Sequence, residues 1–180
     1  MRTTIKKLFW VWEFDKEEKW LNEMAAKGLA LISVGFCRYD FEDCEPGEYA
    51  FKLELLKDKP THPESRKYIE FLESTGAEHV GSYLCWIYLR KKKELGEFEL
   101  FSDLQSRINH LNRMIRLITV LAAINAFSGF YNIMLFFLFG EPISLLGLIN
   151  VAIVVFLVLG GSKLWKKRQK LKEDQLIYES

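Results

Sequence analysis

Residues 117–139 read LITVLAAINAFSGFYNIMLFFLF, a run of 23 residues without a charged side chain. A helix of this length covers ~35 Å, enough to cross the hydrocarbon core of a bilayer. A second uncharged run, ISLLGLINVAIVVFLVLGG, occupies residues 143–161 and covers ~28 Å as a helix. Gly140, Glu141 and Pro142 connect the runs, and glycine and proline favour a tight reversal. The stretch therefore predicts a two-helix transmembrane hairpin.

Basic residues flank this hairpin at both outer ends, and the connector has none: Arg107, Arg113, Arg116, Lys163, Lys166, Lys167, Arg168, Lys170 and Lys172. The positive-inside bias predicts a two-span protein of the cell membrane with both termini in the cytoplasm. Residues 162–180 then form a basic cytosolic tail. A buried hairpin inside a soluble helical bundle is the alternative interpretation.

The tail begins with an aromatic residue among basic ones. Trp165, Lys166, Lys167 and Arg168 fit an anchor at the membrane interface that also attracts anionic lipid. A plain stop-transfer signal explains the same residues, and the two interpretations are compatible.

Small and polar residues recur at helical spacing within both spans: Asn125, Ser128 and Asn132 in the first, and Ser144, Gly147 and Asn150 in the second. In lipid, such residues serve close helix approach and interhelical hydrogen bonding. A conduction pathway is the alternative, but the spans carry no charge. We therefore expect these six residues to pack the two helices together.

Charge divides the chain into two unlike parts. The 25 basic and 24 acidic residues of the 180 give a net charge of +1. Residues 1–100 hold 16 basic and 19 acidic residues, a net charge of −3, whereas residues 101–180 hold 9 and 5, a net charge of +4. The N-terminal part is therefore acidic, which disfavours nucleic acid as a partner.

The N-terminal part alternates between strand-like and helix-like segments. Strands are predicted at 7–14, 29–41, 49–56 and 80–90, and helices at 15–28 and 61–76, where Thr61 and Glu64 have capping-box spacing. This β-α-β-β-α-β order is typical of a ferredoxin-like α+β sandwich. We expect such a cytosolic domain over residues 1–98, with an amphipathic linking helix over residues 99–116.

Aromatic residues are concentrated in the predicted strands. Trp10, Trp12, Tyr39, Trp86 and Tyr88 are the candidates for a binding or pairing surface on a sheet face that no helix covers. An aromatic-rich core partly covered by the linking helix is the equal alternative.

No motif predicts a reaction, a metal or a cofactor. Cys37, Cys44 and Cys85 lack Cys-x-x-Cys spacing, and the three histidines are scattered. Paired carboxylates such as Glu17 and Glu18 fall where a solvated helix face is expected. We therefore assign no catalytic residue.

Three segments carry a family resemblance: LFWVWEFDKEEKWLNEMAAKGLAL at 8–31, CRYDFEDCEPGEYAFKLELL at 37–56, and PESRKYIEFLESTGAEHVGSYLCWIYLRKK at 63–92. They resemble the bacterial family catalogued as domain of unknown function 2812, over about residues 5–105. The resemblance implies a membrane-associated protein and brings no catalytic residues.

These features lead to one functional hypothesis and two rivals. We expect a non-enzymatic, membrane-anchored binding or regulatory module, in stress or envelope regulation. Its expected partners are the lipid bilayer and either a second copy or another protein, and the sequence identifies no small-molecule ligand. The first rival is a structural or transport accessory that acts through its hairpin. The second, an enzyme acting on a lipid or a membrane-proximal substrate, has the weakest support.

Overall fold

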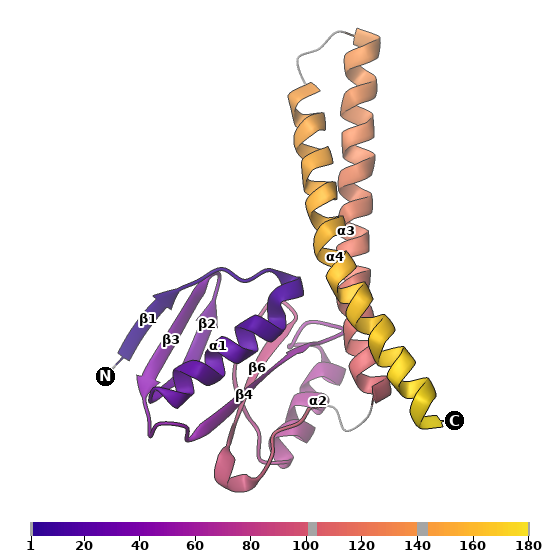
Figure 1. The fold of residues 1–180 in the computed structure, drawn as a ribbon. Coiled ribbons are helices and arrows are strands. Elements are labelled where there is room, and N and C mark those ends of the chain that lie inside the picture. The colour runs from indigo at the N-terminus through magenta and orange to yellow at the C-terminus, as the bar shows by residue number, and fades with distance from the viewer. Residues whose placement is uncertain (1, 101–103, 140–143, 180) are drawn as a thin grey trace. The chain divides into compact units, whose positions relative to one another are not determined.

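The computed structural model describes residues 2–100, 104–139 and 144–179, and the side chains of residues 104, 144–145 and 176–179 lie outside that description. The chain divides into two units, Met1–Ser102 and Asp103–Ser180. The first unit is a mixed α+β structure and the second is a pair of long helices (Figure 1).

Six strands of the first unit form two antiparallel three-stranded sheets. One sheet has the order β1-β3-β2, formed by Arg2–Lys6, Arg38–Asp43 and Leu29–Gly35. The other has the order β4-β6-β5, formed by Tyr49–Leu55, Trp86–Lys92 and Glu78–Tyr83. Helix α1 (Phe14–Ala26) follows β1, and helix α2 (Pro63–Ser74) follows β4. The sequence β1-α1-β2-β3 is thus repeated as β4-α2-β5-β6, with the same strand order in each sheet.

This arrangement differs from the predicted single four-stranded sheet, so the ferredoxin-like fold is not confirmed. The predicted strands at 29–41 and 80–90 are each a hairpin, broken at Phe36-Cys37 and at Leu84-Cys85. Cys37 and Leu84 adopt positive φ of 52° and 55°. Because neither turn contains glycine, asparagine or proline, the residue pattern shows no break there.

The first predicted strand, at 7–14, is also wrong. Strand β1 ends at Lys6, and a short 3-10 helix at Val11–Glu13 leads directly into α1. At α2 the N-cap is His62 rather than Thr61, and its Nδ1 accepts the backbone N–H of Glu64 at 3.3 Å.

Side chains of α1 bind the free edge of strand β4. Asn22 donates to the carbonyl of Phe51 at 3.0 Å and accepts the N–H of the same residue at 2.9 Å. One turn earlier, Glu18 accepts the N–H of Leu53 at 3.2 Å and binds Lys52 at 2.9 Å. Alternate residues of a strand point their backbone N–H and C=O groups to the same edge. Asn22 and Glu18 lie one helical turn apart, so together they bind the backbone groups of Phe51 and Leu53 on this edge.

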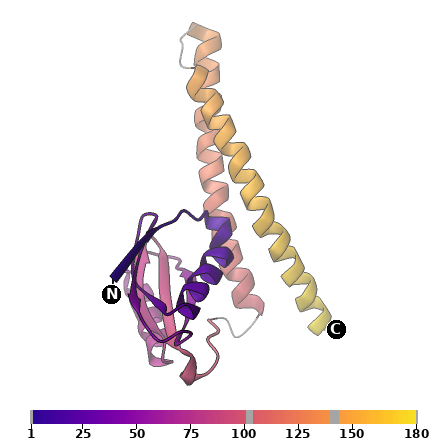
Figure 2. The ribbon, with the colours of Figure 1, turned by 60° about the vertical axis from the view of Figure 1, so that its left-hand side comes forward.

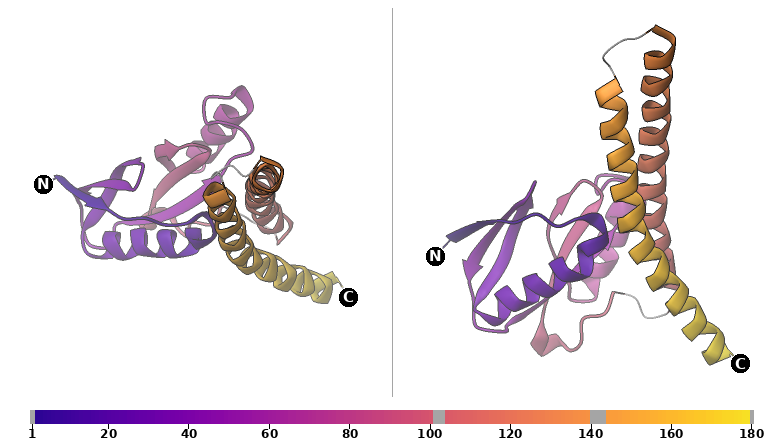
Figure 3. Two further views of the ribbon diagram at one scale, coloured as in Figure 1. Left: turned by 90° about the horizontal axis from the view of Figure 1, so that it is seen from above. Right: turned by 45° about the horizontal axis from the view of Figure 1, so that its top comes forward.

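Strand β6 divides its side chains between two hydrophobic clusters. Tyr88 belongs to the cluster under α1, whereas Ile87 and Leu89 belong to the cluster with Ile69 and Leu72 of α2. Successive side chains of a strand point to opposite faces. Helices α1 and α2 therefore cover opposite faces of this sheet (Figure 3, left), and the expected open sheet face is absent from β6.

The two sheets meet along β2 and β5. These strands lie side by side, yet no backbone ladder joins them within the described residues. A Cβ atom added to Gly81 would lie 3.4 Å from Cγ1 of Val34 and 3.7 Å from its backbone nitrogen. We call this boundary between β2 and β5 the seam.

The second unit consists of α3 (Leu104–Phe139) and α4 (Ser144–Glu179), which pack antiparallel (Figures 1 and 2). Two segments, Gln105–Phe139 and Leu146–Gln175, are long and apolar enough to cross a membrane. Helix α3 joins most of the predicted linking helix to the first span without a break, and α4 extends the second span into the basic tail. The predicted connector at 140–142 lies outside the described residues.

Candidate functional site

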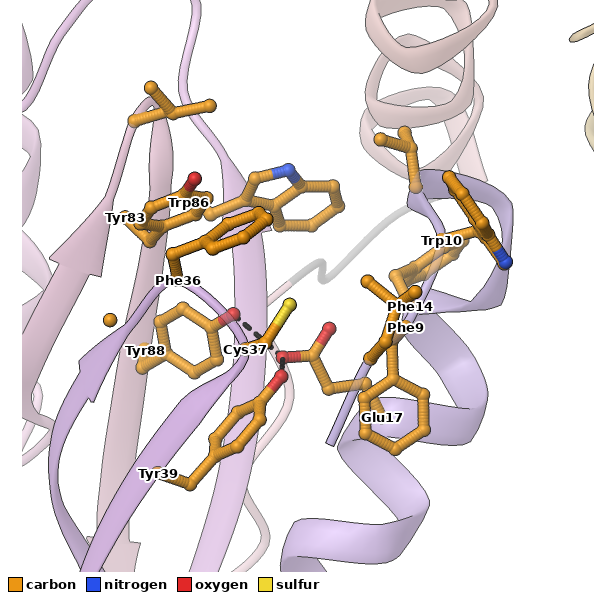
Figure 4. A pocket seen from close by; sticks show the side chains of 14 residues that line it. Phe9, Trp10, Phe14, Glu17, Phe36, Cys37, Tyr39, Tyr83, Trp86 and Tyr88 are labelled. Atoms are coloured by element: carbon orange, nitrogen blue, oxygen red, sulfur yellow. Dashed lines mark hydrogen bonds between the residues drawn. The ribbon is translucent and has the colours of Figure 1, made fainter. Parts of the chain in front are cut away.

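A pocket of about 130 Å³ opens in the first unit, where the β2-β3 and β5-β6 hairpins approach the segment that leads into α1 (Figure 4). Six aromatic side chains form most of its walls: Phe9, Trp10, Phe14, Phe36, Tyr83 and Trp86. Phe36 and Leu84, at the tips of the two hairpins, are 76% and 74% exposed. The pocket is therefore a largely aromatic recess with an apolar rim.

One carboxylate lies at the inner end of this recess. Glu17 of α1 is 8% exposed and accepts hydrogen bonds from the hydroxyls of Tyr39 at 2.7 Å and Tyr88 at 2.6 Å. Tyr39 comes from β3 and Tyr88 from β6, so each sheet supplies one donor. Both phenols donate to Oε1, and the second carboxylate oxygen is directed away from them (Figure 4).

The helix pattern explains why a carboxylate is buried here. Phe14, Glu17, Leu21 and Met24 follow one another at spacings of three and four residues, and all four are buried. They form the face of α1 that packs on the sheets. Glu17 is thus the one ionisable member of an apolar stripe.

Burial determines the protonation of this group. It raises the pKa of Glu17 above the ordinary value of 4.5, while hydrogen bonds from Tyr88 and Tyr39 oppose part of that rise. Burial and the neighbouring Glu17 carboxylate also raise the pKa of both phenols. The tyrosines therefore remain protonated donors at neutral pH. Within residues 2–100, no lysine or arginine forms an ion pair with Glu17.

The structure places four of the five predicted aromatic residues around this pocket: Trp10, Tyr39, Trp86 and Tyr88. The fifth, Trp12, stacks on Trp10 with ring centroids 5.7 Å apart and does not line the pocket. The four lining residues enclose a recess instead of forming a flat sheet surface. Sequence reasoning missed Glu17 because it was assigned to a solvated helix face, although its position in the Phe14–Met24 stripe was a usable signal.

Four of the six residues predicted to pack the hairpin lie at close contacts between α3 and α4: Ser128, Asn132, Gly147 and Asn150. Asn150 donates to the hydroxyl of Ser128 at 3.2 Å. A Cβ atom on Gly147 would lie 2.9 Å from Cγ1 of Ile133 and 3.6 Å from Cβ of Asn132.

Asn125 instead donates to the carbonyl of Leu121 in its own helix. The side chain of Ser144 is outside the description. Near the end of the second span, Trp165 is 48% exposed, and Lys166 and Lys167 are also exposed. Arg168 donates to Asn112 of α3 at 3.3 Å.

Comparison with known proteins gives one match. A family model described as "Protein of unknown function (DUF2812)" matches residues 13–123. That range includes Glu17, Tyr39 and Tyr88 but excludes Phe9 and Trp10 of the pocket wall. No curated protein and no solved structure matches. Within the described residues, no cluster of three or more histidine, cysteine, aspartate or glutamate side chains could hold a metal ion.

Proposed function

Because this chain belongs to the DUF2812 family, whose description assigns no reaction, we propose a function from its own site: a membrane-anchored module whose N-terminal unit binds a small aromatic molecule. One observation carries the proposal. The aromatic recess ends at a buried carboxylate that two phenols hold in place through one of its oxygens. Ligand sites are typically apolar concavities with a few placed polar groups.

Membrane anchoring is the second part of the proposal. The two long apolar helices support it, and the basic residues outside them favour an orientation with both termini in the cytoplasm of a two-span protein. The hairpin then serves as the anchor, because its polar residues are used in helix packing, as between Ser128 and Asn150. The N-terminal unit samples cytoplasmic solutes next to the membrane.

We favour binding over catalysis for this site. Glu17 and the two phenols hold one another in a fixed hydrogen-bonded group, and the raised pKa of each phenol makes it a poor acid at neutral pH. A regulatory role follows if occupancy of the pocket changes what the unit binds, either a second copy or another protein.

Two exposed phenylalanines of the same unit give a matched test. Phe36 lines the pocket at 76% exposure, whereas Phe71 of α2 is 61% exposed and does not line it. The full chain in uncharged detergent would be titrated with compounds of one aromatic ring and a small head group, with tryptophan fluorescence as the readout. Phe36→Ala should weaken binding about threefold to tenfold, the value of one aromatic contact, and Phe71→Ala should leave it unchanged. Equal effects of both substitutions would remove the pocket as the site.

A further inference from the structure

The carboxylate at the inner end of the pocket lacks a counter-ion. Oε1 of Glu17 receives both phenol hydrogen bonds, and no basic side chain within residues 2–100 pairs with the group. Its second oxygen points away from the phenols, toward the side where Trp86 and Phe14 lie (Figure 4). A buried carboxylate is costly unless it is paired, so a positive charge at that oxygen would relieve the cost.

The walls of the pocket favour the same sign of charge. Eight aromatic side chains line the space, Tyr39 and Tyr88 included, and the faces of aromatic rings attract cations, most of all quaternary ammonium groups. An anion would be repelled by both the ring faces and the Glu17 carboxylate. A neutral ligand would gain the apolar contacts but nothing from the carboxylate.

The size of the pocket limits the ligand. Its volume of about 130 Å³ is close to that of cavities of ~150 Å³ that hold a benzene molecule. One aromatic ring or one compact ammonium group fills it, and the remainder of the ligand extends past the exposed rim at Phe36 and Leu84.

We infer that the ligand is a small organic monocation with an aromatic ring, and that Glu17 is the counter-ion that selects it. The inference rests on the proposed function, because it specifies the ligand of that same pocket. The cationic group lies at the second oxygen of Glu17, against Trp86 and Phe14, and Tyr39 and Tyr88 hold the carboxylate in position.

Two probes of the same shape, one charged and one neutral, show whether the charge of the ligand contributes to binding. The (4-hydroxyphenyl)trimethylammonium ion and 4-tert-butylphenol differ only in that a charged nitrogen replaces a carbon. Each would be titrated into the full chain in uncharged detergent, followed by tryptophan fluorescence. Each probe partitions into the micelles to the same extent with either protein. The ratio of its affinities for wild type and for Glu17→Gln is therefore independent of that partitioning.

Glu17→Gln keeps the shape of the side chain, and its amide oxygen can still accept from both phenols. The variant should lose about tenfold or more in affinity for the cation, as expected for a charge-assisted interaction, and little for the neutral probe. Glu23→Gln is the matched control, because Glu23 is an exposed carboxylate of the same helix. It should change neither affinity.

Unchanged binding of the neutral probe to Glu17→Gln also shows that the pocket is intact in that variant. If wild type binds both probes and Glu17→Gln binds the cation equally well, the counter-ion role is wrong while the proposed binding function survives. If wild type binds neither probe, the proposed function fails and the inference fails with it.

Discussion

Tyr39 and Tyr88 lie in different sheets and donate their hydroxyl hydrogens to the same oxygen of Glu17, at 2.7 Å and 2.6 Å. Helix α1 is thereby hydrogen-bonded through one side chain to both halves of the repeated fold. Five predictions test this arrangement and the rest of the structure.

Removing either phenol should destabilise the N-terminal unit. Tyr39→Phe or Tyr88→Phe deletes a buried hydrogen bond to a carboxylate, at an expected cost of about 1–3 kcal/mol each. Urea denaturation of the full chain in detergent would measure it, because four of the five tryptophans lie in this unit. Tyr83→Phe is the control, since the Tyr83 hydroxyl has no hydrogen bond in the described structure. A cost for Tyr83→Phe as large as for the other two would refute the special role of the pair.

The stability of the unit should depend on pH through Glu17. Its pKa is raised on folding, so the group has no effect on stability below the unfolded pKa, near 4.5. As pH rises from there to the folded pKa, the carboxyl group ionises more readily in the unfolded chain than in the folded one. The free energy of unfolding therefore falls, by about 1.4 kcal/mol for each pH unit by which folding raises the pKa. Above the folded pKa the penalty is complete.

Glu17→Gln cannot ionise and so escapes this penalty. In urea denaturation at a series of pH values, its stability relative to wild type should increase above pH 4.5 and then level off. Glu23→Gln, which changes an exposed carboxylate of the same helix, is the control. A flat profile for Glu17→Gln would mean that burial does not raise the pKa.

Asn22 should protect the edge of β4. Asn22→Ala leaves both backbone groups of Phe51 without their partner, which should cost about 1–3 kcal/mol. Amide hydrogen exchange at Phe51 should accelerate accordingly. Glu23→Ala, on the exposed side of the same helix, removes only a surface pair with Lys19 at 4.0 Å and should have little effect. Unaltered exchange at Phe51 in Asn22→Ala would show that water replaces the side chain without cost.

Gly147 should be required for close packing of α3 and α4. Because a Cβ atom there would lie 2.9 Å from Cγ1 of Ile133, Gly147→Leu must separate the helices and should cost about 1–3 kcal/mol. Titration with sodium dodecyl sulfate, followed by circular dichroism, would report the loss. Leu148→Ala changes a side chain that is 62% exposed and serves as the control. Equal resistance to the detergent in both variants would contradict the packing.

Both ends of the chain should lie in the cytoplasm. A green fluorescent protein fused to either terminus should fluoresce, and alkaline phosphatase fused there should be inactive in a bacterial host. Replacing the six basic residues of the tail, from Lys163 to Lys172, with glutamine should weaken this orientation. Active phosphatase at the C-terminus of the wild-type chain would contradict the two-span topology.

The residue pattern predicted features that depend on neighbours in sequence. The apolar runs at 117–139 and 143–161 lie within α3 and α4, and the predicted helices at 15–28 and 61–76 overlap α1 and α2 closely. Helical periodicity and uncharged length are local properties, so a single sequence carries them.

Features that depend on tertiary contacts were not predicted. The turns at Phe36-Cys37 and Leu84-Cys85 lack turn residues and hold Cys37 and Leu84 at positive φ, so nothing in the pattern divided the two long strands. Burial of Glu17 depends on Tyr88, 71 residues away, and no local rule links the two. The aromatic candidates were chosen for their type, whereas their enclosure of a pocket results from how the two sheets meet.

The seam has a mechanical consequence. Since β2 and β5 share no backbone ladder in the described structure, a relative movement of the two sheets would break no strand pairing and would be resisted by side-chain contacts such as those of Glu17 with Tyr39 and Tyr88. The pocket lies across that boundary, with Phe36 from one hairpin and Tyr83 from the other at a ring-centroid distance of 6.1 Å. A molecule bound there would contact both hairpins at once, so its size would set how closely the two hairpin tips approach each other.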